Sequence, residues 1–219
     1  MRGSRAGWWL TLAALTLALM CYYLPWYSHA TAAFTLHAYD LAEWTSLHPA
    51  VRAEVPGLLT SFLLRLPQVT LVWATALLAN SGRDPRLRTV VRGVAVLVAL
   101  RFLPPREFLG AASGDPNYRQ MALLTGLGLA GIVLAMLAQR LPERWQAAIT
   151  AGVLLLGVLV GWWGLTRTRP LLDNFQIEVN IGFGAVGYSL LCLAVAGVLL
   201  GQGMSGRRSA GQAETKKGG

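Results

Sequence analysis

Long apolar blocks dominate this sequence and constrain its fold more than any other feature. At about 1.5 Å of rise per residue, most of them are long enough to cross a hydrocarbon core of roughly 30 Å as helices. A soluble helical bundle would need helices with polar outer faces, and these blocks have none. The sequence therefore predicts an all-α integral membrane bundle of six transmembrane helices. The predicted helices are residues 7–26, 57–80, 89–103, 120–138, 147–165 and 179–204.

The charge content supports a membrane setting. Only 13% of the residues are charged and 54% are hydrophobic, whereas about 25% of the residues in a soluble domain are charged. The net charge of +9 would suggest nucleic acid in a soluble protein. Here the basic residues lie in short stretches between apolar blocks, so no nucleic-acid partner is predicted. The preference for Arg over Lys, with abundant Ala, Gly and Leu, indicates a bacterial genome, and hence the bacterial inner membrane.

The basic residues are distributed unequally between the two sides of the predicted membrane domain. Twelve lie in the N-terminus, the second and fourth connections and the tail, where three acidic residues occur; the other side has five basic and seven acidic residues. Because basic residues favour the cytoplasmic side, both termini are predicted to be cytoplasmic. Residues 1–204 are predicted to form one transmembrane domain, and the polar, Gly-rich residues 205–219 a disordered tail. The apolar run of the first block exceeds the roughly 7–15 residues usual for the apolar region of a signal peptide, so we expect it to remain as an anchor.

The first outer connection, residues 27–56, carries all three histidines. Within it, residues 35–47 are predicted to form an interfacial helix that ends before Pro49. The side chains expected to face water are Asp40, Glu43 and Ser46. The alternative interpretation is a metal site, for which the ligands would be His37, Asp40 and His48. On an ideal helix His48 would lie three turns from His37, and no metal-binding motif is present, so neither a metal nor a cofactor is predicted.

Glycines recur at helical spacing in the last three apolar blocks. Three of them match a dinucleotide-binding pattern, but no strand precedes it, so we interpret all three sets as small-residue faces of packed helices. These faces predict that the last three helices form a tight unit, which could also contact another membrane subunit or a second copy of the chain. The glycines are Gly126, Gly128 and Gly131; Gly157, Gly161 and Gly164; and Gly182, Gly184 and Gly187.

The sequence contains no recognisable catalytic motif. No nucleophile motif is visible, and Asp and Glu are missing from the interiors of all six apolar blocks. Proton-coupled pumps and intramembrane aspartyl proteases need such carboxylates. The protein is therefore not predicted to be an enzyme.

Arg65 is the most informative single residue, because it stands within the second apolar block, roughly 10 Å below its outer edge. Arg101 lies at a similar level, Pro67 removes a backbone donor, and Gln68 follows one turn below Arg65. These residues predict a kinked, polar notch. The arginine either pairs with an acid of the outer loops (Asp40, Glu43, Glu54 or Glu107), binds an anionic ligand or lipid headgroup, or contacts a partner subunit.

Two functions remain open from the sequence. The first is a non-enzymatic accessory or partner-binding membrane subunit with its recognition surface on the outer side. The second is a small transporter or permease component with an outward-facing polar notch around Arg65. The predicted contact residues for a ligand or partner are Arg65, Gln68, Arg101, Asp40, Glu43, Trp44 and Glu107.

Overall fold

The computed structural model describes residues 5–29 and 35–215, with side chains placed as far as residue 202. The chain is 77% helical, which confirms the all-α class. Its helices are α1 (Arg5–Tyr22), α2 (Ala38–Leu47), α3 (Pro49–Arg52), α4 (Leu59–Asn80), α5 (Pro85–Leu100), η1 (Arg106–Leu109), α6 (Pro116–Ala138), α7 (Glu143–Asp173) and α8 (Phe183–Thr215).

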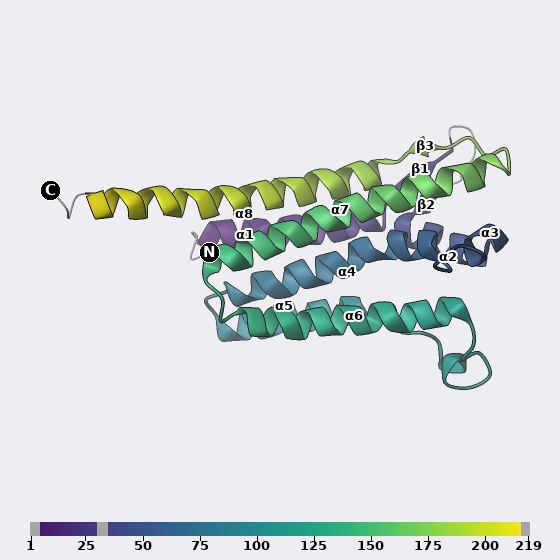
Figure 1. Ribbon diagram of the computed structural model, residues 1–219, viewed down its shortest axis with the longest axis horizontal. Helices are drawn as coiled ribbons and strands as arrows, with labels where there is room; N and C mark the ends of the chain where they lie inside the picture. The colour runs from purple at the N-terminus through teal and green to yellow at the C-terminus, as the bar shows by residue number, and fades with distance from the viewer. Residues whose placement is uncertain (1–4, 30–34, 216–219) are drawn as a thin grey trace.

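Four of the described helices are long and apolar enough to cross a membrane: α4, α6, α7 and the part of α8 from residue 183 to 202. Helices α1 and α5 run alongside them (Figure 1). However, α5 has 16 residues and is only about 24 Å long. The chain therefore has the helices of a membrane protein, and the count of six crossings stays a prediction.

Helix α4 is the centre of the bundle. It contacts α1, α2, α5, α6 and α7, and 78% of its most apolar stretch is buried, compared with 39% to 44% in α6, α7 and α8. Those three helices instead expose large apolar side chains, including Leu134, Leu159 and Leu190. Exposed apolar side chains on apolar helices are what contact with lipid requires.

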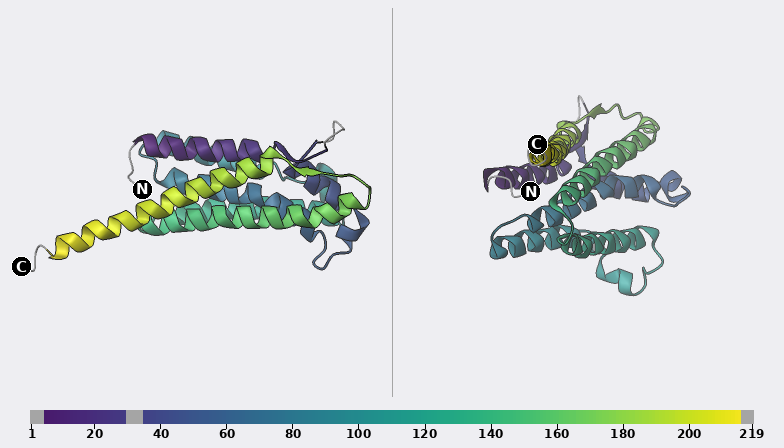
Figure 2. Two further views of the ribbon diagram at one scale, coloured as in Figure 1. Left: turned by 90° about the horizontal axis from the view of Figure 1, so that it is seen from above. Right: turned by 60° about the vertical axis from the view of Figure 1, so that its left-hand side comes forward.

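The long helices alternate in direction, as Figures 1 and 2 show. The start of α1, the end of α8 and the short connections 81–84 and 139–142 lie at one end, which we call the short-loop end. The longer connections lie at the other, the long-loop end. The starts of α5 and α6 follow from the sequence, because Asp84 and Asp115 accept hydrogen bonds from backbone amides of the first turn and a proline follows each.

A small sheet at the long-loop end was not predicted. Strand β1 (Pro25–Ser28) lies between β2 (Thr35–His37) and β3 (Asn180–Ile181), and both pairings are antiparallel. The sheet joins the first long connection to the one between α7 and α8. Residues 35–37, predicted as the start of the interfacial helix, are therefore a strand, and α2 begins at Ala38.

The helix α2 packs on the bundle more deeply than predicted. Ser46, expected to face water, is fully buried, and its hydroxyl donates to the carbonyl of Glu43. Leu41 and Ala42 are also buried, because this face of α2 lies against α4. The position of α2 at a membrane surface stays a prediction.

Most of the glycines do mark close packing, but mainly on other helices: among the last three helices, only α7 and α8 pack closely on each other in the described part of the chain. A Cβ at Gly131 would lie 1.9 Å from Trp73 of α4, and one at Gly164 3.0 Å from the backbone of Leu64, also in α4. The glycines at 182, 184 and 187 face the end of α1 and the residues that follow it, while Gly126 faces open space. The small-residue faces thus serve packing within the chain, mostly on α4 and α1, with Gly128 on Ala99 of α5 and Gly157 also on Tyr188 of α8.

The last helix extends into the segment predicted to be a disordered tail. The backbone of α8 continues to Thr215, and Figure 2 shows it passing beyond the other helices. Residues 216–219 lie outside the described residues.

Candidate functional site

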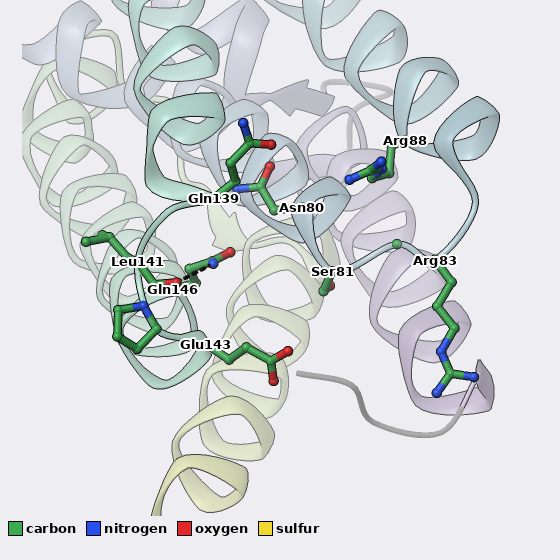
Figure 3. A pocket seen from close by; sticks show the side chains of 10 residues that line it. Asn80, Ser81, Arg83, Arg88, Gln139, Leu141, Glu143 and Gln146 are labelled. Carbon is green, nitrogen blue, oxygen red and sulfur yellow. Dashed lines mark hydrogen bonds between the residues drawn. The ribbon is translucent and has the colours of Figure 1, made fainter.

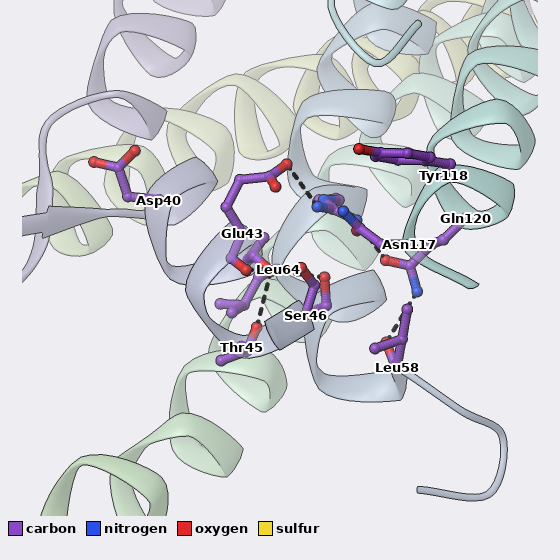
Figure 4. Close-up of polar contacts among 12 residues, drawn as sticks. Asp40, Glu43, Thr45, Ser46, Leu58, Leu64, Asn117, Tyr118 and Gln120 are labelled. Carbon is purple, nitrogen blue, oxygen red and sulfur yellow. Dashed lines mark hydrogen bonds and ion pairs between the residues drawn. The ribbon is translucent and has the colours of Figure 1, made fainter. Parts of the chain in front are cut away.

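Arg65 lies on α4 with none of its surface exposed. Its Nη2 donates to Oε1 of Glu43 over 2.7 Å, and its Nη1 donates to Oδ1 of Asn117 and to Oε1 of Gln120, both over 2.8 Å. Figure 4 shows Glu43 of α2 pointing toward Asn117 and Gln120 of α6. We call these four residues the Arg65 cluster; it joins α2, α4 and α6.

The start of α6 brings the two amides to the arginine. Asp115 caps this helix, and Asn117 and Gln120 then stand one turn apart on the same face. The Nε2 of Gln120 donates to the carbonyl of Leu58, 2.9 Å away, at the start of α4. The side-chain amide of Gln120 is therefore fully engaged: its oxygen binds the arginine and its nitrogen binds the backbone at the start of α4.

The Arg65 cluster combines one anion with two neutral amides. Charge-assisted hydrogen bonds are about twice as strong as neutral ones, so Glu43 supplies the largest share of the compensation for the buried charge. The side chain of Glu43 is 37% exposed, so that it joins the cluster to solvent. The Nε of Arg65 has no hydrogen-bond partner among the described residues. Of the three interpretations of Arg65, this geometry favours the structural ion pair, with Glu43 as its acid.

Gln68 is also engaged within the chain. Its Oε1 accepts a hydrogen bond from the hydroxyl of Tyr23 over 2.7 Å, and its Nε2 donates to the carbonyl of Val98 over 3.0 Å. The residue is fully buried and ties α4 to α5. It is therefore a link between helices rather than an open polar surface beside Arg65.

The other predicted contact residues spread over the long-loop end. The guanidinium of Arg101 lies 4.9 Å from the ring centroid of Tyr39, a cation–π contact that fixes α5 against α2. Asp40 pairs with His37 at 3.0 Å. Trp44 packs edge-on against Phe175 after α7, with 6.0 Å between ring centroids. Glu107 is exposed on η1, away from the Arg65 cluster.

Two further ion pairs at this end were not predicted from the sequence. Arg167 of α7 reaches Oε1 of Glu54 at 2.8 Å, and its Nε donates to the hydroxyl of Thr60. Arg52 of α3 reaches Asp115 at 3.3 Å. Together with the Arg65–Glu43 pair, they attach the long connections to the helices.

Glu54 also satisfies the start of α4, because its Oε2 accepts from the backbone amide of Thr60. Burial alone would raise the pKa of Glu54. The hydrogen bonds from Thr60 and Arg167, with the charge of Arg167, outweigh this and hold its pKa below the usual 4.5. Glu54 is therefore an anion at neutral pH that caps a central helix and pairs with another.

Metal binding finds no support in the part of the chain that the structure describes. No group of three His, Cys, Asp or Glu residues there could hold a metal ion. Two of the candidate ligands instead cap helices: Nδ1 of His37 accepts from the amide of Asp40 at the start of α2, and Nδ1 of His48 accepts from the amide of Ala50 at the start of α3. These histidines serve local helix structure.

Comparison with known proteins gives no relative to which this geometry can be related. No protein-family model, no curated protein and no solved structure matches the chain.

Proposed function

We propose that this chain is a six-helix protein of the bacterial inner membrane, with both termini cytoplasmic, and that it acts as a non-enzymatic accessory subunit. Its recognition surface is the long-loop end. The observation that carries the proposal is the set of ion pairs formed by Arg52, Arg65 and Arg167, which hold the long connections in place. A surface that is ordered before binding loses less conformational entropy when a partner binds.

The long connections also expose large apolar side chains beyond the ends of the bundle. Val55 is 96% exposed, Leu109 is 89% exposed and Leu47 is 69% exposed. Apolar side chains held on an ordered surface rimmed by polar residues are typical of contact sites for a protein partner. They support recognition at this end.

The transporter alternative depends on an open notch around Arg65. The arginine has no exposed surface, its acceptors come from its own chain, and Gln68 is bonded on both sides. The geometry therefore favours the accessory subunit over the transporter.

Co-purification tests whether a protein partner binds at the long-loop end. The chain, tagged at its C-terminus and extracted in a mild detergent, should carry a second membrane protein in a fixed ratio, measured by quantitative mass spectrometry. Val55→Asp and Leu109→Asp should reduce that ratio at least tenfold. Leu137→Asp, the same change at an exposed position near the short-loop end, should leave it unchanged. Wild-type protein that purifies as a partner-free monomer would exclude the accessory role.

Reporter fusions test the orientation separately. A fusion after Arg83 should report the cytoplasm, and one after Asp115 the outer side, because the positive charge lies at the short-loop end. The reverse pattern would overturn the placement of the recognition surface.

A further inference from the structure

A second polar region lies at the short-loop end, far from the Arg65 cluster. It is a pocket of about 670 Å³ where α4 and α6 end and α5 and α7 begin. Figure 3 shows side chains from α4, α5 and α7, and from the connections that follow α4 and α6, around it. A pocket of this size accommodates a small polar ligand or a lipid headgroup.

The charge of this pocket comes mainly from two arginines. Arg83 and Arg88 line it, together with one carboxylate, Glu143, and the amides of Gln139 and Gln146. Neither arginine has a hydrogen bond or ion pair with a described residue, in contrast to Arg65 and its acid. Two helices start here and two end here, so their dipoles largely cancel. The arginines therefore decide the sign of the ligand, which is an anion.

The position of Arg88 is defined by packing, although its charge has no partner among the described residues. The side chain is half-buried, and a Cβ at Gly82 would lie 3.0 Å from its Cγ. The stem of Arg88 thus rests on the backbone of the connection between α4 and α5. This leaves the guanidinium as the part that can reach a ligand.

An apolar groove lies on the neighbouring face, between α1, α4 and α5, with a volume of about 320 Å³. On α5 it extends from Leu87 to Val98, a length of about 17 Å, which is close to half of a hydrocarbon core. Leu87 lines the groove and Arg88, the next residue, lines the pocket. The groove and the pocket therefore both reach the first turn of α5, and this turn is the junction between them.

We propose that an anionic phospholipid binds at this junction, with its phosphate against Arg83 and Arg88 and one acyl chain in the groove. Basic pockets between membrane helices attract anionic headgroups, and an apolar groove the length of one leaflet suits an acyl chain. The inference is independent of the partner proposed above, because it concerns the opposite end of the molecule. From the proposed function, this inference requires only that the helices lie in a membrane.

Native mass spectrometry of the full chain in detergent tests the proposal. Dioleoyl phosphatidylglycerol should bind at least tenfold more tightly than dioleoyl phosphatidylethanolamine. An arginine in contact with an anionic headgroup contributes about 1 kcal/mol, or about fivefold in affinity, so Arg83→Gln with Arg88→Gln should weaken phosphatidylglycerol binding by about 30-fold. The matched control is Arg86→Gln with Arg140→Gln, which removes the same charge from exposed positions outside the pocket and should change affinity less than threefold.

Two further binding measurements distinguish a phospholipid from other ligands of the pocket. Inorganic phosphate should bind at least 100-fold more weakly than phosphatidylglycerol; equal affinity would make this a site for free anions and overturn the lipid. Val94→Phe fills the groove and should weaken lipid binding, whereas Val133→Phe, on the exposed face of α6, should not.

The proposal fails on either of two results. The first is equal binding of the two phospholipids by wild-type protein. The second is an equal loss of affinity in the pocket variant and its charge-matched control, provided that both variants unfold at the wild-type temperature. If the pocket variant is less stable, Arg83→Gln alone, at an exposed position, replaces it with an expected loss of about fivefold.

Discussion

Replacement of Glu43 by Gln is the most direct test of the Arg65 cluster. Gln keeps the shape of the side chain and one acceptor oxygen but removes the charge. Since Arg65 is fully buried, water cannot replace the lost carboxylate, and the cation is left with neutral acceptors only. The variant should therefore fold but be less stable.

The size of the loss follows from the geometry. A hydrogen bond between charged groups contributes about 1.5–3 kcal/mol, and the 2.7 Å separation of Nη2 and Oε1 is that of a good charge-assisted bond. Solvent screening at Glu43, which is 37% exposed, favours the lower half of that range. We expect about 2 kcal/mol, which corresponds to a fall of about 4–8 °C in unfolding temperature for a chain of this length.

Thermal unfolding in detergent, followed by tryptophan fluorescence, measures this loss. Asp40→Asn is the matched control, because Asp40 is an acid of the same helix that pairs with His37 at the surface. It should cost less than about 1 kcal/mol. A double-mutant cycle with Arg65→Met completes the test, since Glu43→Gln should cost almost nothing once the arginine is gone. An equal cost in both backgrounds would show that the pair does not stabilise the protein.

Two more predictions concern packing and pH. Gly131→Ala should destabilise the protein by about 1–3 kcal/mol, because the new Cβ would overlap the indole of Trp73. Gly126→Ala, which meets open space, should instead stabilise it by about 0.5–1 kcal/mol; equal effects in thermal unfolding would contradict the packing. The lowered pKa of Glu54 stabilises the fold above about pH 4.5, and this contribution is lost as the pH falls through the lower, folded-state value. Glu54→Gln should flatten the decline in unfolding temperature between about pH 5 and pH 3, whereas Glu107→Gln, at an exposed position, should not.

The sequence predicts the helical class, but it predicts only one of the three residues that bind Arg65. Apolar length alone predicts the long helices, and Glu43 was one of four acids expected to pair with the arginine. Asn117 and Gln120 were missed, because the fourth helix was expected to start at residue 120. Asp115 followed by Pro116 is the signal of an earlier start, and it places both amides on one face.

The small sheet and the Glu54–Arg167 pair had no comparable signal. Strand β3 has two residues and β2 has three, too few to show an alternating pattern. Glu54 and Arg167 are 113 positions apart, so only the packing of α7 on α4 brings them together. Such features are consequences of the tertiary fold.

The order of the Arg65 cluster along the chain has a consequence for biosynthesis. Glu43 is synthesised 22 residues before the arginine, whereas Asn117 and Gln120 follow it by 52 and 55 residues. When α4 is synthesised, its counter-ion has therefore already been made, but two of its three acceptors have not. The first connection and α4 form the earliest unit that can neutralise the charge, and the arrival of α6 completes its hydrogen bonds.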